Sequence, residues 1–111
     1  MKLTNLTRKT ILATDLKEAV SPTDKFLGLL KKSNPRSLFF TTRFGIHTLL
    51  LGTLIDVIVM DNKNRVVKQQ TVKPNQLFIY NPKYSKVIEL PRGVIKKSKT
   101  QIGDKLSVKT Q

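Results

Sequence analysis

Residues 54–61, LIDVIVMD, restrict the fold more than any other part of this chain. Apolar side chains occupy both alternating sets of positions, and β-branched residues dominate, which is typical of a strand buried on both faces. The one polar interruption is Asp56. The sequence therefore predicts a central strand here, covered by other parts of the chain on both sides.

The longer apolar stretch at residues 44–60, FGIHTLLLGTLIDVIVM, also has to be considered as a membrane span. It falls short of the roughly 20 residues that a spanning helix needs, and it contains His47, Thr48 and Asp56. An aspartate at the centre of a membrane helix costs about 2.5–3.5 kcal/mol. The first twenty residues lack the apolar segment of a secretory signal. We therefore predict no membrane span and a cytoplasmic location.

Short β signals separated by turn residues follow one another along the chain, with the spacing of a β-rich domain. The turn at residues 62–64 makes the segment after it a hairpin partner of residues 54–61. Besides the central strand, β structure is predicted around Leu3, Leu6 and residues 11–13, and at residues 37–42, 65–72, 76–80, 86–90 and 105–108.

Two segments carry helix signals instead. In residues 21–35, Ser21 suits a helix cap, Pro22 suits the first turn, and Asn34-Pro35 ends the segment. Residues 91–100, PRGVIKKSKT, indicate a short basic helix or helical turn. Together these patterns predict one α+β domain over residues 1–111. It would be predominantly antiparallel β, a small barrel-like or strongly bent sheet, with one or two short helices.

The composition excludes several chemistries. With no cysteine and a single histidine, the chain cannot form disulfides, iron–sulfur clusters, a thiol nucleophile or a multi-histidine metal site. Its serines do not lie in a nucleophile elbow, and its five glycines are too scattered for a phosphate-binding loop. The sequence favours a non-enzymatic role and predicts no catalytic residue, metal or cofactor.

The formal net charge of +14, from 21 basic and 7 acidic residues, would attract polyanions. The basic residues are spread along the chain, which is more typical of general surface chemistry than of one docking face. If residues 91–98 are helical, Val94 and Ile95 would pack inward. Four cations then lie toward solvent, as a solvated charged face or as a contact for an anion or nucleic acid: Arg92, Lys96, Lys97 and Lys99.

Asp56 is the main candidate for a site residue. Because residues along a strand alternate between faces, it shares a face with Ile58 and Met60, and Asp61 points to the other face. A buried carboxylate needs hydrogen-bond donors or a positive partner. Two interpretations remain open: a structural polar network, or the floor of a ligand pocket. The predicted ligand-binding set is Arg43, His47, Thr48 and Asp56. Without a nucleophile or metal, this set is not catalytic machinery.

Six short segments stand in an order that is similar to a known family. They are GLL at 28–30, IHT at 46–48, IDV at 55–57, DNKN at 61–64, LPRG at 90–93 and GD at 103–104. Over residues 11–109 this set resembles the domain-of-unknown-function family 192. The resemblance implies a compact, β-rich α+β domain of bacteria and archaea with no established activity.

Two functions follow as hypotheses. The first is a small non-enzymatic binding or accessory domain, with a polar pocket near the Ile-His-Thr and Ile-Asp-Val segments that takes a small ligand or a protein partner. The alternative is a basic protein that associates with nucleic acid through its general positive charge.

Overall fold

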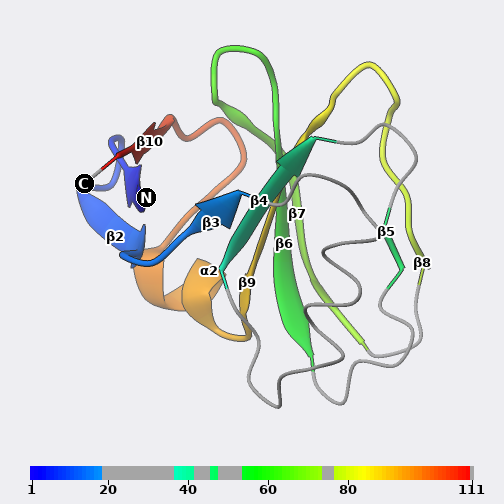
Figure 1. The fold of residues 1–111 in the computed structure, drawn as a ribbon, viewed down its shortest axis with the longest axis horizontal. Helices are drawn as coiled ribbons and strands as arrows, with labels where there is room; N and C mark the ends of the chain where they lie inside the picture. Colours follow the sequence, from blue (N-terminus) through cyan, green and yellow to red (C-terminus); the bar gives the residue numbers. More distant parts are fainter. Residues whose placement is uncertain (19–36, 42–45, 48–53, 74–76, 111) are drawn as a thin grey trace.

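The computed structural model describes residues 1–18, 37–41, 46–47, 54–73 and 77–110, and these form three sheets and one short helix (Figure 1). The predicted helix at 21–35 lies outside the described residues. The largest sheet has the strand order β3 (Lys17–Glu18), β4 (Leu38–Thr41), β9 (Lys86–Pro91), β6 (Ile55–Met60), β7 (Val66–Val72).

Strand β6 has hydrogen-bonded neighbours on both sides. It pairs antiparallel with β7, which follows it through the turn at residues 61–65, and antiparallel with β9 on its other side. Every residue of β6 is buried. The predicted central strand and its hairpin partner are therefore confirmed. The short strand β3 pairs with β4 in parallel, so this sheet is mixed.

Two smaller sheets flank the large one (Figure 1). One is antiparallel and has the order β10 (Leu106–Lys109), β1 (Lys2–Asn5), β2 (Thr10–Ala13), so it brings the two ends of the chain together. The other pairs β5 (Ile46–His47) with β8 (Leu77–Phe78). Helix α2 (Val94–Ser98) follows β9, as the basic segment predicted.

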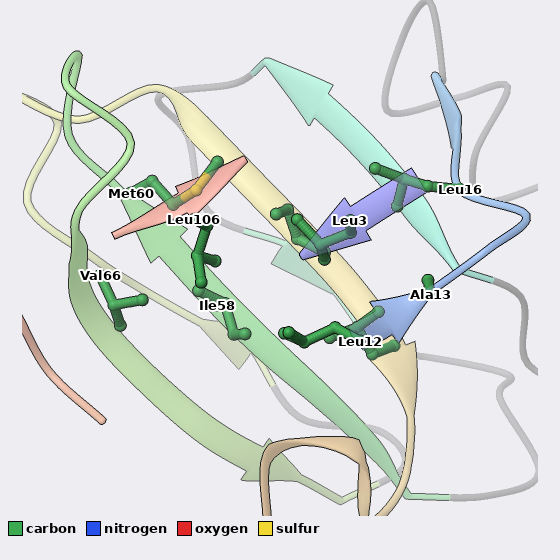
Figure 2. Packing of buried hydrophobic residues seen from close by; sticks show 10 residues of the cluster. Leu3, Leu12, Ala13, Leu16, Ile58, Met60, Val66 and Leu106 are labelled. Carbon is green, nitrogen blue, oxygen red and sulfur yellow. The ribbon is translucent and has the colours of Figure 1, made fainter. Parts of the chain in front are cut away.

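The alternation of side chains along β6 divides the interior into two cores. Val57 and Val59 belong to the first, the β8 core, with Phe78 of β8 and Val87 of β9. Ile58 and Met60 belong to the second, the β1 core, which Figure 2 shows. The β1 core also contains Leu3, Leu12, Ala13, Leu16, Val66, Ile88, Leu90 and Leu106.

The strand-rich architecture, with mostly antiparallel pairing and a short helix, agrees with the predicted α+β class. Within the described residues the strands form three sheets and do not close into a barrel. The barrel-like description stays a prediction. Among the described residues, no helix is long and apolar enough to cross a membrane.

A buried carboxylate joins the first hairpin to the C-terminal segment. Asp104 accepts hydrogen bonds on Oδ2 from Asn5 Nδ2 at 2.9 Å, from the Gln101 backbone N–H at 3.0 Å and from Arg8 Nε at 3.1 Å. Burial by itself raises the pKa of Asp104, but the hydrogen bonds from Asn5, Gln101 and Arg8 outweigh it and hold this pKa below its ordinary value. Segments almost a hundred residues apart in sequence are thus held together by one charge.

We expect Asp104 to make the fold sensitive to acid. Because its pKa is lowered in the folded state, its contribution to stability is present above the unfolded value of about 3.9 and is lost as pH falls through the lower folded value. Urea unfolding at a series of pH values should show the free energy of unfolding falling more steeply below pH of about 4 in the wild type than in Asp104→Asn.

The matched control is Asp15→Asn, because Asp15 is an exposed carboxylate. It should leave the acid dependence close to that of the wild type. If the free energy of unfolding fell equally steeply with pH in the wild type and in Asp104→Asn, the role assigned to Asp104 would be contradicted.

Candidate functional site

Asp56 lies inside the large sheet, between Thr71 on β7 and Leu90 on β9, with a side chain that is 1% exposed. Its carboxylate accepts three hydrogen bonds. Thr71 Oγ1 donates to Oδ1 at 2.7 Å, and the backbone N–H groups of Gly93 and Ile95 donate to Oδ2 at 3.1 and 2.9 Å. The buried charge is thus compensated by donors on the neighbouring strand and on the segment that follows β9.

These contacts explain how helix α2 begins. Backbone N–H groups in the first turn of a helix lack partners within the helix, and a polar side chain at the N-cap usually accepts from them. The N-cap of α2 is Gly93, which has no side chain and adopts φ 95°. Asp56, which lies on β6, accepts the hydrogen bonds that an N-cap side chain would otherwise accept. Its negative charge also suits a helix N-terminus.

Asp56 therefore faces helix α2 and the β1 core, since Val94 and Ile95 of α2 pack against that core. Its predicted neighbours on this face, Ile58 and Met60, belong to the same core. The inward packing of Val94 and Ile95 is confirmed as well.

The other members of the predicted ligand-binding set are described less fully. Arg43 and Thr48 lie outside the described residues. His47 is described by its backbone alone, in β5, where it pairs with Leu77 of β8. The next residue of β8, Phe78, belongs to the β8 core, on the face of the large sheet opposite Asp56. The described residues do not bring His47 and Asp56 together, and the four-residue site stays a prediction.

Glu89 is a second carboxylate buried within the large sheet, and its pattern in the sequence did not single it out. It lies in β9 between Leu38 of β4 and Val57 of β6, is 2% exposed, and has both carboxylate oxygens buried. By strand alternation it shares the face of Val87 and Val57, the face of the β8 core. The sequence KVIEL at residues 86–90 carries a signal for this burial. Its apolar residues lie on both faces of the strand, as in a central strand, so Glu89 is expected to be buried with them.

The two carboxylates therefore lie on opposite faces of the large sheet. Asp56 faces the side of α2, and Glu89 faces the side on which β5 and β8 lie (Figure 1). A carboxylate in an apolar core needs compensating charge or donors, which makes such residues frequent members of functional sites.

The four predicted anion-contact residues lie around helix α2, and all are exposed: Arg92, Lys96, Lys97 and Lys99. The fold adds two cations from the opposite end of the chain. Arg8 Nη2 donates a hydrogen bond to Gln101 Oε1, in the segment after the helix, at 2.8 Å. Thr10 Oγ1 donates to the carbonyl of Ser98, at the end of the helix, at 2.8 Å. Arg8 and Lys9 thus extend the basic region, which we call the α2 patch.

The internal carboxylates make the outer surface more basic than the net charge suggests. Asp56, Glu89 and Asp104 are buried, whereas Asp15 and Glu18 are exposed. Among the described residues, none of the lysines and arginines is buried. Part of the negative charge of the chain is therefore in the interior, and the positive charge is at the surface.

The fold and these buried carboxylates define a small β-rich α+β domain with a basic surface. The chain belongs to the domain-of-unknown-function family DUF192, described as "Uncharacterized ACR, COG1430", which it matches over residues 4–108. This confirms the resemblance seen in its motifs.

Two archaeal relatives carry the family designation UPF0127. One, from Pyrococcus horikoshii, is 36% identical over 72% of this chain and 75% of its own length. The other, from Pyrococcus furiosus, is 27% identical over 92% of this chain and 93% of its own length. These relatives do not assign a specific function.

Two solved structures share the fold and cover 96% of this chain. One is a protein of unknown function from Novosphingobium aromaticivorans, with a TM-score of 0.77, 14% identity and 82% of its own chain covered. The other, from Sinorhizobium meliloti, has a TM-score of 0.73, 16% identity and 89% of its own chain covered. At this identity the likeness concerns the fold alone.

The geometry predicts that Asp56 stabilises the fold through α2. Asp56→Ala removes the acceptor of two backbone N–H groups and one hydroxyl, and we expect it to lower the free energy of unfolding by about 2–4 kcal/mol. Thr71→Val removes one donor and leaves the α2 contacts, so its loss should be about 1 kcal/mol. Urea unfolding measures both values. Equal losses in the two variants would contradict a special role for the α2 contacts.

Proposed function

We propose that this chain is a non-catalytic binding domain with a polar pocket around the Ile-His-Thr segment. The pocket would include Arg43, His47 and Thr48. Asp56 would stabilise the sheet behind the pocket from the opposite face, where it holds the segment at 93–95. A small ligand or a segment of a protein partner would occupy it. We also propose that the domain acts in the cytoplasm and spans the whole chain.

The observation that carries this proposal is the burial of Glu89. Its carboxylate lies on the sheet face against which the β8 core packs, and β8 is the hydrogen-bonded partner of the strand that contains His47. An apolar residue at this position of β9 would pack without the penalty for burying a charge. A buried carboxylate on the sheet face that packs against the β8 core supports a polar binding site on this side.

Native mass spectrometry tests this proposal. Protein purified without denaturation should carry a bound small molecule, or show a raised melting temperature with a member of a library of small acids and amines. Glu89→Gln keeps the side-chain shape and removes the charge. We expect it to weaken capture by about tenfold or more, because a charge-assisted hydrogen bond is lost.

Glu18→Gln, at an exposed carboxylate, is the matched control and should bind as the wild type does. Wild-type protein that carries no ligand and responds to none of the library would contradict the pocket. Glu89→Gln that binds normally would also contradict it.

A second candidate function, association with nucleic acid, rests on a different observation. The exposed cations of the α2 patch come from two distant parts of the sequence, which hydrogen bonds from Arg8 and Thr10 to Gln101 and Ser98 hold together. The solved Sinorhizobium meliloti structure is described as a candidate transcription regulator, which is a statement about that protein. Clustered exposed cations are the feature by which proteins neutralise backbone phosphates.

Salt dependence tests this second candidate. Binding of a generic duplex, followed by fluorescence anisotropy, should weaken steeply between about 50 and 200 mM salt. Lys96→Gln/Lys97→Gln should reduce the slope of log K against log salt by about two. Lys2→Gln/Lys109→Gln removes two charges from paired positions of β1 and β10, outside the α2 patch, and should change the slope less. No binding at low salt would contradict the candidate.

A further inference from the structure

A cleft of about 290 Å³ opens at the turn between β6 and β7. Its walls come from two turns that lie at the same end of the large sheet (Figure 1). The first is the β6–β7 turn, and the second is the turn that precedes β9. The lining residues are Asp61, Asn62, Lys63, Lys83 and Tyr84.

Both turns are held rigidly, and each presents a lysine. In the first, Asp61 Oδ1 accepts from the backbone N–H groups of Lys63 and Arg65, both at 2.9 Å. In the second, Asn81 Oδ1 accepts from the Lys83 N–H at 2.9 Å, and the Tyr84 N–H donates to the Asn81 carbonyl at 3.0 Å. A site on fixed backbone loses less entropy when a ligand binds.

Further cations surround the first turn. Lys86 Nζ donates to Asn64 Oδ1 at 2.8 Å, and Lys105 Nζ donates to the Lys63 carbonyl. Arg65 also belongs to this turn and donates from Nη1 to the Gly103 carbonyl at 3.2 Å. Cations therefore outnumber carboxylates around the cleft, which favours an anionic ligand.

Asp61 is the one carboxylate that lines the cleft. The N–H of Arg65 is the main reason that the pKa of Asp61 lies below its ordinary value, so the group stays ionised at neutral pH. Within the described part of the chain its Oδ1 is held by the turn, and Oδ2 accepts no hydrogen bond. An acceptor of this kind suits a ligand that also carries hydroxyl or amino groups, such as a sugar or a base.

Tyr84 supplies an aromatic wall. Its ring is half-buried against the β8 core, and Lys83 Nζ lies 5.8 Å from the ring centroid. Aromatic rings of this kind are platforms on which nucleobases stack. Lysines, an aromatic ring and an acceptor together match the three parts of a nucleotide: phosphate, base and sugar.

We propose that this cleft binds a nucleotide, with Lys63 and Lys83 contacting its phosphate and Tyr84 its base. At about 290 Å³ the cleft lies near the lower limit of small-ligand pockets, which favours a single nucleotide unit. The unit is either free or part of a single strand. The proposal is independent of both candidate functions above, because it uses neither the predicted pocket nor the α2 patch.

Titration calorimetry and amide NMR with adenosine 5′-monophosphate test the proposal. We expect saturable binding, with the largest shifts at residues 61–65 and 81–84, and weaker binding of inorganic phosphate alone. Lys63→Gln/Lys83→Gln should weaken binding of the nucleotide by about tenfold or more, because both phosphate contacts are lost. Tyr84→Leu should bring nucleotide and phosphate affinities close together, because stacking is removed.

The charge-matched control is Lys2→Gln/Lys109→Gln, at paired positions of β1 and β10, which should bind within about twofold of the wild type. Equal weakening in both double variants would overturn the site, as would saturable binding that shifts amides elsewhere. Equal affinity for phosphate and nucleotide in the wild type would overturn the nucleotide assignment. Thermal unfolding confirms that each variant is folded.

Binding of a short deoxythymidine oligonucleotide distinguishes the two possible ligands, a free nucleotide and a single strand of nucleic acid. Tighter binding of the strand than of the mononucleotide, lost in Lys63→Gln/Lys83→Gln, assigns the cleft to single-stranded nucleic acid. Equal or weaker binding of the strand assigns it to the free nucleotide. Absence of binding by the mononucleotide and the strand alike overturns the proposal.

Discussion

The burial of β6 on both faces is the constraint on which the rest of this structure depends. Because its side chains alternate between two apolar cores, the chain must supply a packing layer on each side of the large sheet. Strands β1, β2 and β10 supply one layer, with α2, and the β8 segment packs on the other side. Asp56, inside this strand, then connects the sheet to α2 through backbone hydrogen bonds.

Three of the described carboxylates hold parts of the fold together. Asp56 caps α2, Asp104 joins the first hairpin to the C-terminal segment, and Asp61 holds the β6–β7 turn. Each accepts N–H groups that would otherwise lack partners, so its charge is stabilised where it is. Among the described residues, lysines and arginines at the surface outnumber the carboxylates there. The surface is therefore suited to anionic ligands, whichever of its basic regions binds them.

Much of the fold could be predicted because it rests on local patterns. Residues 54–61 showed a strand buried on both faces, the turn after it predicted the β6–β7 hairpin, and residues 91–100 predicted α2. The site was harder to predict. The pairing of Asp56 with Gly93 and Ile95 spans almost forty residues, and nothing local in either segment indicates the other. Glu89 was missed because its role depends on which face of β9 meets which core.

The sequence by itself determined the family, the β-rich class, the central strand and the excess of positive charge, because these follow from residue order and composition. Only the tertiary structure decided what each charged group touches. It directed Asp56 to α2, placed Glu89 on the opposite face, and set Lys63 and Lys83 on the two walls of one cleft. The physical reason is that hydrogen bonds and charge interactions act over a few ångströms in space. Asp56 meets its partners on α2 from almost forty positions away, and Asn5 meets Asp104 from almost a hundred.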